Sequence, residues 1–275
     1  MKLLAWDTSS KTGALAALEW APSSSQGWSG VKLVCEWTLN LDSAQHSERL
    51  MWSIDKMLQA AGWKLQDVDI FGVGVGPGSF TGLRIGITTA RTLAHALNKP
   101  LIGVSSLAAL VRPAAAWLSG HASNPLIVGA SDACKGELFA IWGNAQSVSK
   151  CAASPEGDSS GLWSAEVQEQ VLRPAELMPL LTEALGEAGT WLAMGEGSER
   201  YLDFWAQLPA DRRIHLPLPF TQGVQGRSVA MLAWEAYQRG LSQQALRVHP
   251  RYLRASDAEI KLKAGLLPKG PTRGA

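Results

Sequence analysis

The sequence is poor in cysteine and has no long apolar run. Its three cysteines, Cys35, Cys134 and Cys151, are odd in number and far apart among 275 residues. This distribution suits reduced thiols and excludes a C-x-x-C metal or redox motif. No apolar run reaches membrane-spanning length, and the chain enters an apolar strand without the basic and apolar regions of a signal peptide. We therefore expect a cytoplasmic protein that makes no contact with a membrane.

Histidine pairs and nucleophile motifs are also missing. The chain has neither the H-E-x-x-H helix of zinc peptidases nor the G-x-S-x-G elbow that presents a nucleophilic serine. No two histidines have the spacing of metal ligands. The five are His46, His95, His121, His215 and His249. We predict no metal site, no cofactor and no catalytic residue.

An excess of charge of either sign is absent. Lysine and arginine number 25 and aspartate and glutamate number 24, which leaves a net charge of +1. This balance does not indicate a large electrostatic footprint for nucleic acid, so we expect contact with RNA only indirectly, through partner proteins. The C-terminal part has a local basic bias, which we interpret as a solvated tail. Its cations are Arg247, Arg251, Arg254, Lys261 and Lys263.

Glycine, by contrast, is abundant and is concentrated between Gly72 and Gly86, where the sequence reads GVGVGPGSFTGLRIG. Residues 70–75 alternate β-branched side chains with glycine, which predicts a buried strand approached closely by another backbone. Pro77 ends this strand. The whole stretch therefore predicts a strand, a glycine-rich bend and a helix.

The bend itself has two interpretations. Gly76 and Gly78 permit backbone conformations that other residues avoid, and Ser79 can cap the following helix. Free N–H groups at such a helix start could hold a phosphate. However, the stretch lacks the lysine of a P-loop, and its glycines do not have dinucleotide-binding spacing. We favour a structural turn and leave a phosphate site open.

The helix after the bend has a row of very small side chains. Gly82, Gly86, Ala90 and Ala94 recur at every fourth position and so share one helix face. A glycine inside a helix costs about 1 kcal/mol relative to alanine, so Gly86 should have a packing reason. The row can pack on the protein's own sheet or dock against a helix of another chain. We take the second alternative as a candidate partner interface.

An earlier helix, predicted over residues 47–61, has surplus apolar surface. Leu50 and Ile54 fall on its core-facing side by their spacing. Met51 and Trp52 lie off that side, and exposed apolar residues of this kind often mark partner sites. Two interpretations are open: these four residues belong to a partner interface, or the polar insertion at residues 21–30 covers Met51 and Trp52.

Several blocks of this sequence resemble the bacterial TsaB (YeaZ) family. The longest is the stretch from Gly76 to Gly86, which is too long for chance to explain the agreement well. Shorter blocks agree with the family in the same order. They are Asp7-Thr-Ser-Ser10, His46-Ser-Glu-Arg-Leu50, Gly103-Val-Ser-Ser-Leu107, Asp132-Ala-Cys-Lys-Gly-Glu137 and Pro250-Arg-Tyr-Leu-Arg254. The resemblance is strong over residues 1–140, thinner afterwards, and returns near residue 250.

The resemblance implies an α/β protein with a two-lobed actin-like (ribonuclease H-like) fold, in which helices flank mixed sheets. We expect a first lobe at residues 1–105, a second at 106–260 with an insertion at 144–161, and a disordered tail at 261–275. Hydrophobic periodicity agrees with this order. It predicts strands at 2–6, 14–20, 31–41, 70–75, 101–104, 126–130, 138–142, 163–172 and 191–194, and helices at 47–61, 82–98, 107–118, 175–188, 198–207 and 227–239.

In actin-like ATPases the turn after the first strand wraps phosphate, normally with a glycine after the aspartate. Here Thr8 and Ser9 follow Asp7, and an aspartate in a turn often satisfies the turn's own backbone. Asp132 would face Asp7 across the cleft between the lobes, yet it can equally close a hairpin turn. We list a candidate remnant of a nucleotide or phosphate site. It comprises Asp7, Thr8, Ser9, Gly76, Gly78, Ser79 and Asp132.

The family resemblance implies a noncatalytic subunit. Such a subunit pairs with the related transferase TsaD, recruits the ATPase TsaE, and supports formation of N6-threonylcarbamoyladenosine beside the anticodon of tRNA. It forms a homodimer when TsaD is absent. TsaD binds metal through two histidines four residues apart; here Arg91 and His95 have that spacing, and arginine cannot ligate a metal. The alternative hypothesis is a self-sufficient actin-like ATP-dependent phosphotransferase that uses Asp7, Asp132 and the loop at 76–82.

Overall fold

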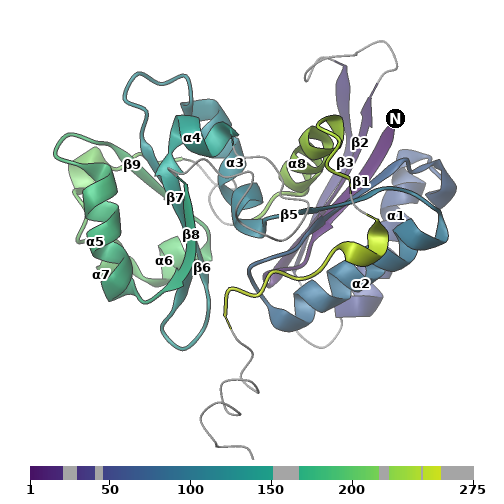
Figure 1. The fold of residues 1–275 in the computed structure, drawn as a ribbon, viewed down its shortest axis with the longest axis horizontal. Helices are drawn as coiled ribbons and strands as arrows, with labels where there is room; N and C mark the ends of the chain where they lie inside the picture. Colours follow the sequence, from purple (N-terminus) through teal and green to yellow (C-terminus); the bar gives the residue numbers. More distant parts are fainter. Residues whose placement is uncertain (21–29, 41–45, 151–166, 217–222, 243, 255–275) are drawn as a thin grey trace, which may run out of the picture.

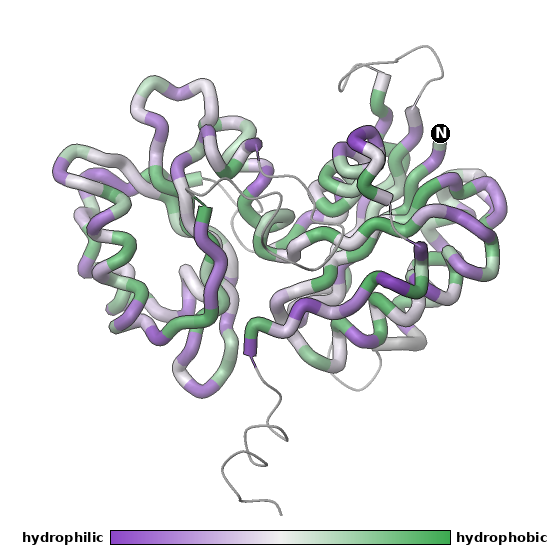
Figure 2. The backbone as a smooth tube through the Cα atoms, viewed as in Figure 1, coloured by the Kyte–Doolittle hydropathy of each residue, from purple (hydrophilic) through white to green (hydrophobic). Residues whose placement is uncertain are grey.

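The structure, a computed structural model, describes residues 1–20, 30–40, 46–150, 167–216, 223–242 and 244–254. Two β-sheets lie in separate halves of the molecule, and helices cover both of them (Figure 1). In Figure 2 the strands are largely hydrophobic, whereas the outer turns are more hydrophilic. The predicted tail at 261–275, residues 21–29 of the first insertion and most of the insertion at 144–161 lie outside the described residues.

The first sheet has the strand order β3-β2-β1-β4-β5. β1, β2 and β3 form an antiparallel meander, and β4 and β5 continue the sheet in parallel with β1. Parallel neighbours need a crossover, and helices provide it after β3 and after β4. The strands are β1 (Lys2–Asp7), β2 (Thr12–Trp20), β3 (Val31–Asn40), β4 (Ile70–Gly74) and β5 (Leu101–Val104).

The second sheet repeats this plan with the order β8-β7-β6-β9. β6, β7 and β8 are antiparallel, and β9 pairs with β6 in parallel. The strands are β6 (Leu126–Asp132), β7 (Leu138–Asn144), β8 (Gln168–Leu172) and β9 (Trp191–Met194). The α/β arrangement expected from the sequence, with two mixed sheets flanked by helices, is confirmed. β8 covers only part of the strand predicted at 163–172: Val167 lies outside the strand, and residues 163–166 lie outside the described residues.

Alternation along β1 shows how the first sheet is covered. Leu4 and Trp6 belong to the apolar cluster under α1 (His46–Ala61) and α2 (Phe80–Ala96). Leu3 and Ala5 point to the other face, into the cluster of α3 (Ser106–Leu118) and α8 (Gly226–Gln238). Successive strand residues point to opposite faces, so both faces of this strand are buried. The first sheet is therefore a central layer between two pairs of helices.

Short helices complete the second half. α5 and α7 contribute to the apolar cluster on its outer side, whereas α4 packs on α3. The elements are α4 (Ala145–Lys150), α5 (Pro174–Leu185), α6 (Glu196–Arg200), α7 (Leu202–Trp205) and the single turns η1 (Leu65–Asp67), η2 (Ala210–Arg212) and η3 (Ala245–Arg247). One prediction was wrong here, since the helix expected at 198–207 is divided at Tyr201. Residues 145–150, within the predicted insertion at 144–161, form a helix that the sequence did not predict.

Part of the predicted second lobe at 106–260 packs on the first sheet and not on the second. α8 packs on β1, β2, β4 and β5 of the first sheet. Its first residue, Gly226, lies so close to β2 that a Cβ atom there would be 2.3 Å from the backbone of Leu15. Trp234 of α8 stacks on Trp20 of β2 with ring centroids 4.2 Å apart. The chain thus returns to its first half, and this return could not be inferred from strand and helix order alone.

Candidate functional site

The turn after β1 holds Asp7 inside the protein. Asp7 is fully buried. One carboxylate oxygen accepts hydrogen bonds from the backbone N–H and the hydroxyl of Ser9, at 2.8 and 2.6 Å. The other accepts from the Ser106 hydroxyl at 2.5 Å, at the start of α3. Three donors from this chain therefore occupy the carboxylate, and they join β1 to the helix that begins the second half.

Burial raises the pKa of Asp7 above its ordinary value, and the hydrogen bonds from Ser106 and Ser9 oppose this shift. Gly74 makes room for the carboxylate, since a Cβ atom at Gly74 would overlap the Asp7 Oδ2 atom. Ser106 also accepts a hydrogen bond from the Gly76 N–H at 3.1 Å. This geometry favours the turn-satisfying interpretation of Asp7 over a contact with magnesium or phosphate.

The glycine-rich bend is filled by the chain itself. The Ser79 N–H donates to the Ser9 carbonyl at 2.6 Å, and the Gly82 N–H donates to the Ser79 hydroxyl at 3.2 Å. Gly78 lies against the same carbonyl, since a Cβ atom there would be 2.3 Å from it. Because Ser9 and Ser79 take up these donors, the start of α2 is capped internally. The structural turn is the interpretation that this geometry favours.

The row of small residues on α2 faces the end of β1 and the turn after it, at Thr8. A Cβ atom on Gly82 would lie 2.0 Å from the Thr8 carbonyl oxygen, and one on Gly86 would lie 2.2 Å from the Thr8 hydroxyl. That hydroxyl is buried and donates to the Gly82 carbonyl at 2.7 Å. Ala90 and Ala94 are also fully buried. Of the two alternatives for this row, close packing on the chain's own sheet explains all four positions.

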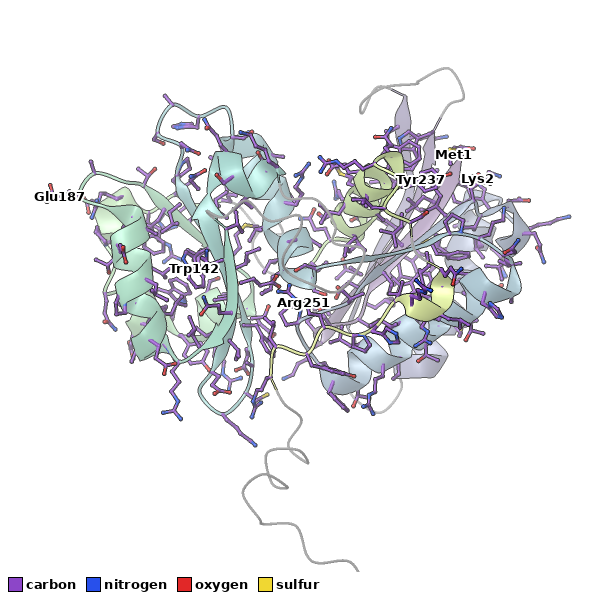
Figure 3. All side chains as sticks on the ribbon, in the orientation of Figure 1. Met1, Lys2, Trp142, Glu187, Tyr237 and Arg251 are labelled. Atoms are coloured by element: carbon purple, nitrogen blue, oxygen red, sulfur yellow. The ribbon has the colours of Figure 1, made fainter. Side chains whose placement is uncertain are left out.

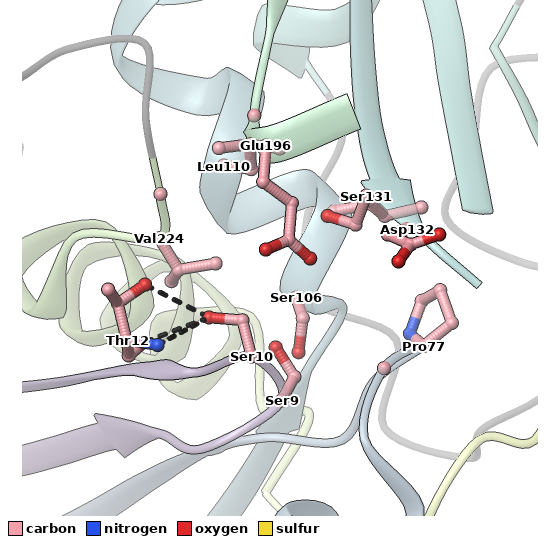
Figure 4. A pocket seen from close by; sticks show the side chains of 14 residues that line it. Ser9, Ser10, Thr12, Pro77, Ser106, Leu110, Ser131, Asp132, Glu196 and Val224 are labelled. Carbon is pink, nitrogen blue, oxygen red and sulfur yellow. Dashed lines mark hydrogen bonds between the residues drawn. The ribbon is translucent and has the colours of Figure 1, made fainter. Parts of the chain in front are cut away.

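A small pocket lies between the two halves (Figure 4). Its volume is ≈ 30 Å³, about enough for two water molecules and far below the roughly 300 Å³ of a small ligand site. The figure shows Ser9, Ser10 and Ser106 on one side of it, with the Glu196 carboxylate reaching in from the other. Glu196 follows Gly195, in the bend between β9 and α6. A carboxylate here opposes the approach of a phosphate.

Asp132 lies at the rim of the same pocket but is engaged by its own neighbours. It forms an ion pair with Arg200. Its carboxylate accepts hydrogen bonds from the Tyr201 hydroxyl at 3.2 Å and from the Cys134 N–H at 3.1 Å. Burial raises the pKa of Tyr201, and the negative charge of Asp132 raises it further. The expected hairpin turn after β6 is therefore present, closed by Asp132, and Asp7 does not face this residue across open space.

A buried ion pair that the sequence did not predict joins the two halves. Arg251 pairs with Glu169 on the edge strand β8, and the Ser105 hydroxyl donates to the same carboxylate at 3.0 Å. The Glu169 side chain is 3% exposed. Burial raises its pKa, and the Arg251 charge opposes that rise. The Arg251 N–H also donates to the Val75 carbonyl at 2.8 Å, so residues 250–254 cross from the first sheet to the second (Figure 3). The interpretation of the basic C-terminal segment as a solvated tail was wrong for Arg251, whose side chain is only 11% exposed in this ion pair. In the sequence, the family resemblance of this block was the signal for a structural role.

The candidate interface on α1 divides into two sets. Leu50 and Ile54 are buried in the core, as their spacing predicts. Met51 is 46% exposed and Trp52 is 59% exposed. Trp52 has a neighbour on β3, since its ring lies 6.3 Å from that of Trp37. The alternative that residues 21–30 cover this surface concerns residues outside the described part of the chain.

Within the described ranges, no three histidine, cysteine, aspartate or glutamate side chains come together as a group that could hold a metal ion. Arg91 and His95 lie on the outer side of α2, where His95 is exposed. In the same ranges, every helix is too short or too polar to cross a membrane.

Comparison with known proteins adds three kinds of match. The family model for TsaD, tRNA N6-adenosine threonylcarbamoyltransferase, matches residues 40–152. The tRNA threonylcarbamoyladenosine biosynthesis protein TsaB of Escherichia coli is 30% identical over 198 residues, which cover 68% of this chain and 77% of that protein. TsaB of Haemophilus influenzae is 31% identical, with 74% and 78% covered. The solved structure of YeaZ from Pseudomonas aeruginosa has a TM-score of 0.67 at 26% identity, with 92% and 99% covered.

Proposed function

This chain belongs to the TsaB family, and from that membership we propose that it is a noncatalytic subunit of a tRNA-modifying assembly in the cytoplasm. In this proposal it binds the transferase TsaD, acts with TsaE, and supports formation of N6-threonylcarbamoyladenosine next to the anticodon. The relatives' names supply the pathway. The partner role rests on features of this chain.

The observation that carries the partner role is the exposed pair Met51 and Trp52. A tryptophan that is 59% exposed leaves a large apolar surface in water, and it adjoins a methionine that is 46% exposed. Tryptophan is the residue type most enriched among those that dominate binding energy at protein interfaces. We therefore place the docking surface on the outer side of α1, centred on Met51 and Trp52. The same surface can pair with itself when TsaD is absent, since a homodimer uses one patch on both subunits.

The small-residue row belongs to this proposal only indirectly. Gly82 and Gly86 contact Thr8, so their role is to hold α2 close to β1 and thereby support the helix pair. A bulky residue at Gly86 would displace α2 from the sheet. Lost binding to TsaD in such a variant would then report misfolding rather than a missing contact, and a test on the surface of α1 is sharper.

The alternative, an ATP-dependent phosphotransferase, finds less support in the cleft. Asp7 is occupied by Ser9 and Ser106, and Asp132 by Arg200 and Tyr201. Glu196 adds a negative charge where phosphates would lie. Calorimetry of the purified chain with ATP and magnesium separates the two hypotheses, because micromolar binding with turnover would favour the enzyme.

The partner role is tested with two tryptophan variants. Trp52→Ala removes the centre of the proposed surface, and Trp117→Ala removes a tryptophan on α3 that is 68% exposed. Both changes lie at the surface, so we expect the free energy of unfolding to change by less than about 0.5 kcal/mol in each variant. In gel filtration with TsaD, the wild type and Trp117→Ala should comigrate with it and Trp52→Ala should not. Equal comigration of all three would contradict the proposed surface.

A further inference from the structure

Two segments of this chain that are far apart in sequence contain no acidic residue. α2 reads FTGLRIGITTARTLAHA, and residues 244–254 read QALRVHPRYLR. Together they carry five arginines, whereas the whole chain has almost equal numbers of cations and anions. These arginines can form one positively charged surface only if the two segments lie side by side.

The fold brings them side by side. η3 packs on α2, and the chain then runs along the helix toward its start (Figure 1). At that end, Tyr252 stacks on Phe80 with ring centroids 4.8 Å apart. The Tyr252 hydroxyl also accepts a hydrogen bond from the Arg84 side chain at 3.1 Å. In Figure 2, hydrophilic residues recur along this C-terminal segment. α2 and residues 244–254 thus form one continuous surface, which we call the basic face.

The arginines of this face divide by their partners. Arg251 and Arg254 turn inward, to Glu169 and to Glu137 respectively, and so belong to the contact between the halves. Arg84, Arg91 and Arg247 form no ion pair with any acid in the described part of the chain. Arg84 and Arg247 are exposed, and Arg91 is partly exposed. Their charges are therefore not neutralised by described residues of this chain.

Arg84 is also held in a defined position. Its guanidinium carbon lies 3.8 Å from the centroid of the Phe80 ring, and its hydrogen bond to Tyr252 fixes a second point. Phe80 is 37% exposed and Tyr252 is 43% exposed. A planar guanidinium stacked on an aromatic ring loses less freedom when it binds a phosphate, because it is already ordered. This cluster therefore combines a fixed cation with exposed aromatic surface.

We propose that the basic face contacts the sugar–phosphate backbone of tRNA, so that this subunit binds the RNA directly. The proposal rests on the proposed function for its choice of polyanion, and it revises the expectation of indirect contact. Arg84 and Arg91 are seven residues apart on one side of α2, which places them about 10 Å apart along the helix axis. Arginine and exposed aromatic rings are the combination that binds phosphates and unstacked bases.

Two variants with the same change in net charge test the proposal. The face variant is Arg84→Glu/Arg91→Glu/Arg247→Glu. The control variant is Lys11→Glu/Lys32→Glu/Lys150→Glu, at three exposed lysines outside the face. Arg91→Glu/Arg247→Glu, which spares the Arg84 cluster, serves if the triple variant unfolds. Binding of an in vitro transcribed tRNA with adenosine 3′ of its anticodon is measured by fluorescence anisotropy over a salt series, for the full chain alone and with TsaD.

We expect the face variant to weaken binding of the tRNA about tenfold or more and to lower the slope of log affinity against log salt by roughly two to three. The control should stay within about twofold of the wild type. Equal weakening by both variants would show a response to net charge only and would overturn the proposal. Unchanged binding by the face variant would overturn it as well. So would a loss of TsaD comigration with unchanged tRNA binding, which would assign the face to a protein.

Failure of this inference is distinguishable from failure of the partner role. The partner role depends on Trp52 and is read by comigration with TsaD, without RNA. The tRNA titration of the isolated chain is read without TsaD. Trp52→Ala should therefore leave that titration unchanged.

Discussion

The contact of α2 with Thr8 permits a prediction that distinguishes two neighbouring glycines. A Cβ atom on Gly82 would meet the Thr8 carbonyl oxygen at 2.0 Å, which is backbone and cannot be removed by mutation. A Cβ atom on Gly86 would meet the Thr8 hydroxyl at 2.2 Å, and the next Thr8 atom, Cβ, lies at 3.5 Å. Thr8→Ala therefore removes the obstacle to alanine at Gly86 but leaves the obstacle at Gly82.

The expected changes in the free energy of unfolding combine three contributions, which are overpacking, helix propensity and one buried hydrogen bond. Overpacking costs about 1–3 kcal/mol, and alanine in place of glycine inside a helix gains about 1 kcal/mol. Gly86→Ala should then destabilise the wild type by up to about 2 kcal/mol but stabilise the Thr8→Ala background by up to about 1 kcal/mol. Gly82→Ala should destabilise both backgrounds by up to about 2 kcal/mol, because its obstacle is backbone and stays in place. Thr8→Ala alone should cost about 1 kcal/mol, for the buried hydrogen bond to the Gly82 carbonyl.

Urea unfolding followed by circular dichroism gives the free energy of unfolding for the six proteins of these two cycles. A double-mutant cycle isolates the coupling, which should be about 1–3 kcal/mol for Thr8 with Gly86 and near zero for Thr8 with Gly82. Similar coupling for both glycines would refute the assignment of the two contacts. Rescue of Gly82→Ala by Thr8→Ala would mean that β1 moves away from α2 and that the backbone contact is not rigid.

Two further predictions concern buried carboxylates. Burial raises the pKa of Asp7 above its ordinary value of 3.8, so above that pH the folded chain binds more protons than the unfolded chain and stability falls as pH rises toward the folded pKa. Asp7→Asn should remove this part of the decline, as urea midpoints measured from about pH 4 to 8 will reveal. Glu169→Ala leaves Arg251 buried without its partner and should cost about 3–5 kcal/mol, whereas Glu169→Leu/Arg251→Met should recover most of that loss in urea unfolding.

Local patterns in the sequence predicted the elements of this fold well. β5 and β9 have the predicted bounds, and the predicted strand and helix around the glycine-rich bend are present within two residues. These segments carry strong local signals, because alternation marks a strand and glycine with proline marks its end. Capping of α2 by Ser79 could be predicted for the same reason, since the cap and its partner are close in sequence.

The partners of distant segments could not be predicted. The return of α8 to the first sheet and the pairing of Arg251 with Glu169 depend on contacts between residues 82 or more positions apart. The spacing of Gly82 and Gly86 indicated a close approach by some backbone, but it could not say whose. The structure identifies it as the backbone at Thr8, in the turn that follows β1. Periodicity describes one element at a time, so it leaves open which surface each element meets.

The hydrogen bonds inside the cleft make a binding role at the protein surface the better hypothesis for this chain. An anion at the start of α2 would have to displace the Ser9 carbonyl from the Ser79 N–H, and a cation at Asp7 would have to displace Ser9 and Ser106. Each buried polar group left without a partner costs about 1–3 kcal/mol, so either ligand must first offset several kcal/mol before it binds. Trp52, Arg84 and Arg247 carry no such cost, because they already face solvent. The free energy of binding a partner or an RNA is therefore more readily available outside the cleft than within it.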